Sequence, residues 1–296
     1  MGIWARFVEK IGDGTLRNVP RGRVGRARVG LITIIPEEFD AAKDVFGLDQ
    51  NIEGTGYFVA NASTRGRGWD VALTQSSDRS NVPAFGDVKA MMEDLRPQIM
   101  ILVGIAGGLC DAQRRGRDGI AVGDVVMADY VSYTEFLKLE AGAQKLRSYP
   151  IDHPSVPLKT RVSQPLSKIF DLQSALVRRF PQGQGAVCKI HIGQIVSGEK
   201  VLGDVNSAVQ KGLLDPFDKA LAVDMESIGM ARAVCDGRTS FWYHPRYAVI
   251  RGISDLVDGE DNGGQRANWK QFAAYAAAEV AREFVRRLPP DPQGAS

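Results

Sequence analysis

Runs of apolar residues alternate with amphipathic segments along most of this chain. The first apolar run, residues 28–35, predicts a strand, and Pro36-Glu37-Glu38 after it predicts the first turn of a helix, where proline is favoured. Residues 99–105 are apolar without interruption, which is typical of a strand buried on both faces. Ala106-Gly107-Gly108 then allows another part of the molecule to approach the backbone closely.

The remaining pattern continues the alternation of strands and helices. Residues 56–62 and 69–75 predict paired strands with a turn at 64–68, and 122–131 and 186–196 predict two more strands. Helices are predicted at 82–96, 162–180 and 208–214, and a long amphipathic helix at about 268–288. We therefore expect an α/β fold, a three-layer αβα sandwich around a central mixed, largely parallel sheet.

The same pattern indicates one domain with two extensions. Residues 28–289 form the expected α/β domain, because neither a repeat nor a linker interrupts them. Residues 1–27 form a basic N-terminal extension in which arginines alternate with glycine and proline, and residues 290–296 form a flexible tail. We interpret the extension as a solvated or oligomer-contacting arm, with binding of nucleic acid or acidic groups as the alternative.

Two apolar runs near the C-terminus end in carboxylates. Residues 222–226 read as a strand that ends at Glu226 and opens into a helix, and residues 249–255 read as a strand that ends at Asp255. Ionised carboxylates are costly to desolvate, so a carboxylate at the end of a buried run needs a partner or a chemical role. At the ends of neighbouring strands of an α/β sheet, both would line the crevice where ligands usually bind.

Composition narrows the functional classes. The chain has 296 residues, 44% of them hydrophobic, and a net charge of +2, which is not a nucleic-acid signature. It has no apolar run of about 18 residues and no signal-peptide pattern, so we expect neither a membrane span nor export. Three widely spaced cysteines and three histidines lack disulfide or metal spacing, which predicts a cytoplasmic protein with no metal and no cofactor: Cys110, Cys188, Cys235, His153, His191 and His244.

Several motifs, taken in order, resemble the nucleoside phosphorylase/nucleosidase superfamily. They are VGLI (29–32), EE (37–38), VGIAGGL (103–109), VGDVV (122–126), IVSG (195–198), VDME (223–226) and RGISD (251–255). The resemblance spans about residues 28–288, and it is greatest to methylthioadenosine/S-adenosylhomocysteine nucleosidases and to the nucleosidase domains of defence effectors. It implies a homo-oligomeric enzyme that acts on a small purine nucleoside or nucleotide without a cofactor.

The resemblance also implies roles for individual residues. Asp255 matches the general acid that protonates the leaving purine, although a helix N-cap is the structural alternative. Glu226 matches the carboxylate that holds the ribose hydroxyls, and Met225 would pack on the sugar or merely in the core. Glu38 matches the residue that activates water, with Glu37 as its neighbouring alternative. The motifs place the remaining substrate contacts at Ser197, Ser254 and Gly107.

The surroundings of the nucleophile favour hydrolysis over phosphorolysis. Phosphorylases of this superfamily carry an arginine directly before the glycine motif and a Gly-x-Pro-x-Arg-like segment after the first strand. Here Val103 and Thr33-Ile34-Ile35-Pro36 occupy those positions. Both phosphate-binding features are therefore missing, while an acidic residue is present that would repel phosphate and activate water. We therefore expect an N-ribosyl hydrolase, with phosphorolysis or a nucleotide-binding sensor without turnover as the alternatives.

Three positions that are expected to contact the substrate depart from the family pattern. Ile105 replaces a small hydroxyl residue, and Val201 replaces an aromatic residue that stacks on the purine. Arg79 lies in a segment, 77–80, that replaces a glycine-rich turn, and its forked donor suits phosphate, although a surface role is the alternative. Arginines at 114, 115 and 117 offer a second phosphate contact or belong to a solvated loop.

Overall fold

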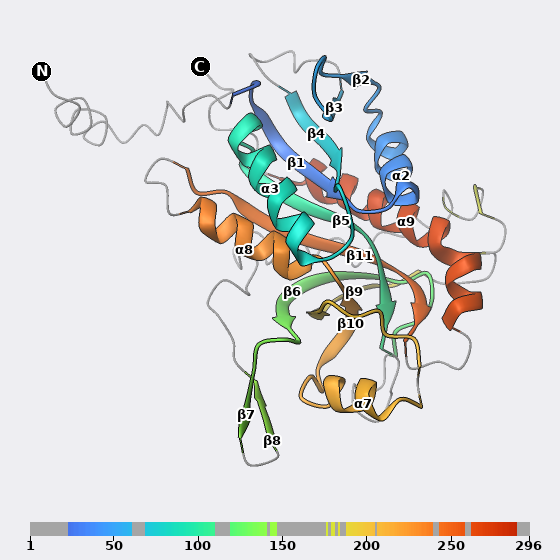
Figure 1. Cartoon of the computed structure of the whole chain (residues 1–296). Coiled ribbons are helices and arrows are strands. Elements are labelled where there is room, and N and C mark those ends of the chain that lie inside the picture. The colour runs from blue at the N-terminus through green and yellow to red at the C-terminus, as the bar shows by residue number, and fades with distance from the viewer. Residues whose placement is uncertain are drawn as a thin grey trace, which may run out of the picture.

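A central nine-stranded sheet organises the molecule (Figure 1). The computed structural model describes residues 23–60, 69–109, 119–140, 143–146, 188–204, 206–238, 243–257 and 262–288, together with 176, 179, 180 and 183. The basic extension up to residue 22, the tail, the turn at 64–68, the arginine cluster at 114–117 and nearly all of the helix expected at 162–180 lie outside the described residues.

The sheet has the strand order β10-β9-β6-β11-β5-β1-β4-β3-β2. Its pairing is parallel from β4 through β1 and β5 to β11 and again from β6 through β9 to β10, and antiparallel elsewhere. The strands are β1 (Ala27–Thr33), β2 (Gln50–Asn51), β3 (Phe58–Val59), β4 (Trp69–Gln75), β5 (Ile99–Gly108), β6 (Val125–Tyr133), β9 (Ile190–Ser197), β10 (Ala220–Asp224) and β11 (Arg246–Leu256). A separate hairpin, β7 (Leu137–Glu140) with β8 (Ala143–Leu146), projects from the body (Figure 1).

Helices cover both faces of this sheet, as the predicted sandwich requires. Helices α2 (Pro36–Phe46) and α9 (Asn262–Arg286) pack together on one face, and α3 (Asn81–Leu95) and α8 (Ser227–Gly237) pack together on the other (Figure 1). The short helix α7 (Ala208–Leu214) lies beyond β10. The core between the layers is formed by aliphatic strand residues and by the alanine-rich face of α9. None of the described helices is long and apolar enough to cross a membrane.

The far end of the sheet curls back on its centre. Strand β10 pairs with β9 and also runs antiparallel to β5, where Ala222 lies opposite Gly108 and Val223 opposite Gly107. We expected the strands that end in Glu226 and Asp255 to be neighbours, and this is wrong, because β10 and β11 each pair with β5 on different sides. The curl of β10 onto β5 nevertheless places Glu226 and Asp255 in the lining of one pocket.

Most predicted elements are confirmed, with shifted boundaries. The strand predicted at 56–62 is reduced to β3, which pairs antiparallel with β4. Strand β5 continues through the glycines to Gly108, because the absence of side chains there lets β10 and β11 lie on either side of it. The last helix begins at Asn262, six residues before the predicted start.

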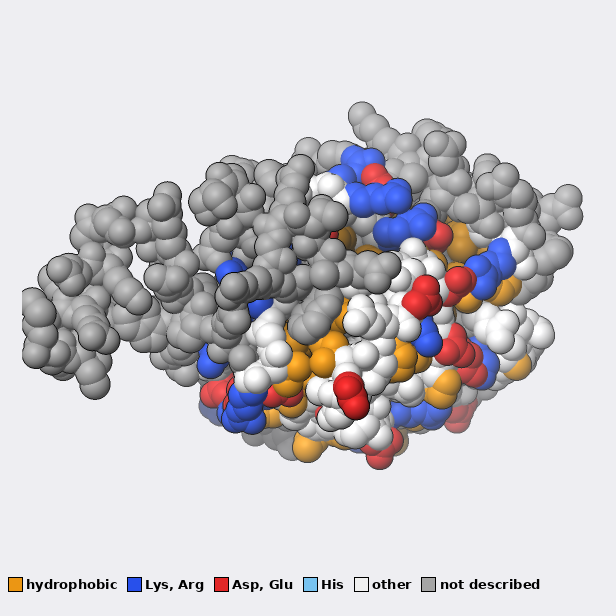
Figure 2. All heavy atoms as spheres, turned by 90° about the horizontal axis from the view of Figure 1, so that it is seen from above, with side chains coloured by type: hydrophobic (Ala, Val, Ile, Leu, Met, Phe, Trp, Pro, Cys, Tyr) orange, Lys and Arg blue, Asp and Glu red, His pale blue; other side chains and the backbone are white. Residues whose placement is uncertain are grey.

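The surface seen from above carries charges of both signs. Lysine and arginine side chains are interspersed with aspartate and glutamate over the described part of this face, and hydrophobic side chains form several patches between them (Figure 2).

Candidate active site

A pocket opens where the loops after β1, β4 and β9 meet the ends of β5, β10 and β11. The empty space within it, including the part open to solvent, amounts to about 880 Å³. Its lining combines apolar side chains with polar groups that come from separate segments. The lining residues most relevant to chemistry are Glu38, Arg79, Ile105, Gly107, Lys200, Val201, Met225, Glu226, Ser254, Asp255 and Arg266.

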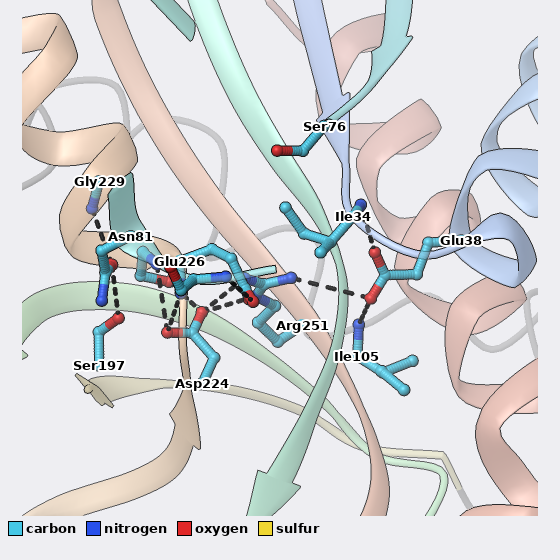
Figure 3. A network of polar contacts seen from close by, with 12 residues as sticks. Ile34, Glu38, Ser76, Asn81, Ile105, Ser197, Asp224, Glu226, Gly229 and Arg251 are labelled. Carbon is cyan, nitrogen blue, oxygen red and sulfur yellow. Dashed lines mark hydrogen bonds and ion pairs between the residues drawn. The ribbon is translucent and has the colours of Figure 1, made fainter. Parts of the chain in front are cut away.

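A fully buried arginine, Arg251, joins three carboxylates beneath this pocket (Figure 3). Its Nε donates to Asp224 Oδ2 at 2.8 Å, and its Nη2 lies 2.7 Å from the same oxygen and 3.0 Å from Glu226 Oε2. Its Nη1 has no hydrogen-bond partner among the described residues and lies 4.0 Å from Glu38 Oε1. A buried N–H without an acceptor is costly, so this atom faces a place for a water or ligand oxygen.

Gly104 on β5 makes this arrangement sterically feasible. A Cβ atom at this position would lie 2.4 Å from both Arg251 Nη1 and Glu38 Oε1. Any side chain there would therefore separate the two groups or push them out of the site. The glycine keeps the gap between the guanidinium and the carboxylate open.

Glu38 is held in place by backbone donors. Its Oε2 accepts from Ile34 N at 2.7 Å and Ile35 N at 3.2 Å, and its Oε1 accepts from Ile105 N at 2.8 Å. Burial raises its pKa, against the opposing effects of Arg251 and these N–H groups. The neighbouring Glu37 turns away and forms an ion pair with Lys270. The structure thus separates the two glutamates, and Glu38 alone enters the pocket.

Glu226 lies on the opposite side of Arg251 from Glu38 (Figure 3). Its Oε2 accepts from Arg251 and its Oε1 accepts from Ser80 N at 3.3 Å, which leaves one lone pair free on each oxygen. Burial raises its pKa to about 7, although Arg251 acts in the opposite direction. Asp224 has no such spare capacity, because it also accepts from the side chain and the N–H of Ser227, the first residue of helix α8.

Asp255 forms the other polar end of the pocket. It is 7% exposed, and its Oδ1 accepts from Ser254 Oγ at 2.5 Å. Burial raises its pKa, while Ser254 and the nearby charge of Arg266 lower it. Gly107 lies beside this carboxyl and makes room for Val257, because a Cβ at Gly107 would lie 2.2 Å from Val257 Cγ2.

Asn81 connects the loops that carry these groups. Its Oδ1 accepts from Ser197 Oγ at 3.1 Å and Gly229 N at 2.9 Å. Its Nδ2 donates to Gly198 O at 3.2 Å and Glu199 Oε1 at 3.0 Å. One buried amide thereby links the start of α3, the end of β9 and the first turn of α8.

Nine of the ten residues predicted for the site line the pocket, and Ser197 does not. Ser197 is fully buried, and its hydroxyl is bonded to Asn81 instead of facing the cavity. Val201 does line the pocket but is 71% exposed, and among the described residues no aromatic side chain replaces the missing stacking ring. The sequence reasoning missed Arg251 and Asn81 as structural partners of the site. An arginine inside the apolar run 249–253 was the signal for the first.

The fold and the pocket together define an α/β protein equipped for acid–base chemistry on a small molecule. The chain belongs to the phosphorylase superfamily, whose family model matches residues 80–288. A 5′-methylthioadenosine/S-adenosylhomocysteine nucleosidase of Staphylococcus aureus is 26% identical over 219 residues, which are 74% of this chain and 82% of that protein.

Solved structures share the fold. Futalosine hydrolase of Helicobacter pylori aligns with a TM-score of 0.62 and 19% identity, over 89% of this chain and 98% of that one. The methylthioadenosine/S-adenosylhomocysteine nucleosidase of S. pneumoniae, solved with a transition-state inhibitor, aligns with a TM-score of 0.64 and 22% identity, over 88% of this chain and 99% of that one.

Proposed function

We propose that this protein hydrolyses the N-glycosidic bond of a purine nucleoside or nucleotide, releasing the free base, most naturally adenine, and a ribose derivative. The observation that carries this proposal is the gap between Glu38 Oε1 and the unpartnered Nη1 of Arg251. A water held there has an acceptor and a donor fixed on two sides. The relatives named as adenosine-derivative nucleosidases support the same reaction class.

Glu38 activates the water in this mechanism. The raised pKa makes Glu38 a stronger base than an exposed carboxylate once it is ionised. Arg251 Nη1 donates to the water oxygen and orients a lone pair away from itself, toward C1′ of the sugar. The water loses its proton to Glu38 as its oxygen bonds to C1′, and the bond from C1′ to the purine nitrogen breaks.

Asp255 supplies the proton that the departing base needs. A purine anion is a poor leaving group, and protonation at N7 converts it into a neutral one. The raised pKa of Asp255 keeps the carboxyl group protonated at a higher pH than usual, which is the property required of a general acid. The hydrogen bond from Ser254 fixes the orientation of the carboxyl.

Glu226 binds the sugar. Its two free lone pairs accept hydrogen bonds from the 2′ and 3′ hydroxyls, and its ionised form stabilises the positive charge that develops on the ribosyl ring. Arg251 and Ser80 N hold the carboxylate from behind, so little reorganisation is needed during the reaction. Met225, beside it in the pocket, covers the sugar face.

The charge around the nucleophile supports hydrolysis over phosphorolysis. Three carboxylates, Glu38, Asp224 and Glu226, surround the single guanidinium of Arg251. A phosphate dianion entering this cluster would meet an excess of negative charge in a buried site, where repulsion is strong. Water is neutral and meets no such barrier.

The direct test is release of free base. The purified protein is incubated in phosphate-free buffer with adenosine, methylthioadenosine, AMP and ATP, and the products are separated by chromatography. We expect base release without added phosphate, and loss of at least about 100-fold in rate for Asp255→Asn, with unchanged circular dichroism. Ligand-induced stabilisation without base release from any substrate would support a sensor instead, and release only with phosphate would support phosphorolysis.

We further propose a cytoplasmic homo-oligomer. The described cysteines, Cys188 and Cys235, are both free thiols, which suits a reducing compartment. The homo-oligomer is what the resemblance to the superfamily implies. Light scattering coupled to size-exclusion chromatography tests the assembly.

A further inference from the structure

The proposed mechanism assigns no role to two guanidinium groups in the pocket. Arg79 and Arg266 both line the cavity, and neither side chain donates a hydrogen bond or forms an ion pair within the part of the chain that the structure describes. A neutral nucleoside would leave both charges unmatched. Their positions therefore bear on the charge of the substrate.

Arg79 lies at the sugar end of the pocket. It directly precedes Ser80, whose N–H binds the Glu226 carboxylate. The charge of Arg79 lowers the pKa of Glu37, but Lys270 already neutralises that glutamate through an ion pair. Arg79 is an exposed residue at the edge of the cavity that it lines, and its side chain forms no ion pair within the described part of the chain.

The loop that carries Arg79 is held at its start by Asp87 and at its end by the bond from Ser80 N to Glu226. Asp87 Oδ2 accepts from Ser76 Oγ at 2.7 Å, from Ser77 N at 2.8 Å and from Ser77 Oγ at 3.0 Å. Asp78 Oδ1 accepts from the backbone N–H of Arg79 at 2.7 Å. These bonds fix the backbone on which the guanidinium stands, so a bound anion would not have to order the loop.

Arg266 belongs to the other end. Its charge acts on Asp255, the carboxyl assigned to the base, whereas that of Arg79 acts on Glu37 beside the water-activating residue. The two cations are therefore associated with different carboxylates, and Arg79 is the one near the sugar.

We propose that the substrate carries a phosphate on its 5′ carbon and that Arg79 binds it. This inference rests on the proposed function. With the 2′ and 3′ hydroxyls on Glu226 and C1′ toward Glu38, the 5′ carbon is the sugar substituent that remains free to extend. A forked guanidinium binds phosphate oxygens through two parallel, charge-assisted hydrogen bonds. The substrate class is thus a purine nucleoside 5′-phosphate.

The test compares kcat/KM for AMP with kcat/KM for adenosine in phosphate-free buffer, in the parent protein, in Arg79→Gln and in Arg287→Gln. Arg287 serves as the matched control. It forms an ion pair with Glu283 at the end of α9 and does not line the pocket. The parent should prefer AMP, and Arg79→Gln should reduce that preference by about 10- to 100-fold, the value of a charge-assisted bond pair. Arg287→Gln should leave the preference unchanged.

Several results would overturn the inference while leaving the hydrolase intact. The first is base release with no preference for AMP over adenosine. The second is a preference for AMP that survives Arg79→Gln or is lost only in Arg266→Gln. The third is an Arg79-dependent preference for S-adenosylhomocysteine, which carries a carboxylate. Calorimetric binding of AMP and adenosine to Asp255→Asn, with and without Arg79→Gln, needs no turnover. Arg79-dependent binding of AMP to Asp255→Asn would support the phosphate site. The absence of base release from any substrate would count against hydrolysis but not against that site.

Discussion

Ser80 holds a backbone conformation that side chains rarely adopt. Its φ is 95° and its ψ is 167°, a region occupied almost exclusively by glycine, and it stores of order 1–3 kcal/mol of strain. The strain persists because this geometry turns the Ser80 N–H toward Glu226. The strained residue therefore lies at the proposed sugar-binding carboxylate, and its side chain makes no contribution to that bond.

Ser80→Gly should consequently stabilise the protein. Glycine adopts this φ without a steric penalty, so we expect the free energy of unfolding to rise by about 1 kcal/mol, with the N–H bond and the activity retained. Ser207→Gly is the matched control, because Ser207 has a φ of −64° and accepts from Gln210 N as the N-cap of α7. That change should destabilise by a few tenths of a kcal/mol. Equal effects of the two substitutions in urea unfolding would contradict the strain at Ser80.

Glu226 links stability to pH through its raised pKa. Burial raises that pKa from the ordinary 4.5 to about 7, so the folded protein binds this proton more tightly than the unfolded chain does. The corresponding stability is fully present below pH 4.5 and is lost as the pH rises through 7, a change of about 3 kcal/mol at most.

Glu226→Gln removes this titration. As the pH rises from 4.5 to 8, the free energy of unfolding of the variant should therefore increase relative to that of the parent. Glu93→Gln, at an exposed residue paired with Arg23, provides the control and should show no such trend. A difference that stays flat across this pH range would contradict the raised pKa.

At the scale of elements, the site depends on how α3, β9 and α8 are joined. Asn81, the first residue of α3, bonds through its side chain to groups at the end of β9 and in the first turn of α8, and it is 5% exposed. Asn81→Ala should lower the free energy of unfolding by about 2–4 kcal/mol, because several buried polar groups lose their partner. It should also lower kcat for every substrate alike, since it acts through the loops and touches no substrate. Asn51→Ala removes an amide that donates to Thr55 and Tyr57 in an exposed turn and should cost far less. Equal losses from the two variants would contradict the linking role.

The sequence predicts these elements better than their contacts. Apolar periodicity locates β5, β11 and α8 because each buries a face whose pattern is visible along the chain. The curl of β10 onto β5 is not predictable in this way, because it depends on the pairing of residues 222–223 with residues 107–108, which no periodicity along the chain reveals. For the same reason Ser197 is misplaced: its motif fixes its position on β9, but the direction of its hydroxyl depends on Asn81, 116 residues away.

At the scale of the whole molecule, the pocket is assembled from segments that are distant in sequence. Glu38 precedes the region matched by the family model, which begins at residue 80, yet its carboxylate reaches Arg251 across β5. A sequence motif identifies each carboxylate, and the structure adds that both line one cavity and are held by different partners, Glu226 by Arg251 and Asp255 by Ser254. The sugar and the base should therefore bind to separable parts of the site.

Thermal stabilisation by two ligands measures that separation. A ligand at 100 times its Kd stabilises a protein by about 2.7 kcal/mol, and each kcal/mol raises Tm by roughly 2–4 °C for a chain of this size. Glu226→Gln should lose most of the stabilisation by a non-hydrolysable nucleoside analogue and keep that by adenine. Asp255→Asn should lose stabilisation by adenine, because its carboxyl meets the base. If each variant lost its stabilisation by the nucleoside analogue and by adenine equally, the assignment of Glu226 to the sugar and Asp255 to the base would be wrong.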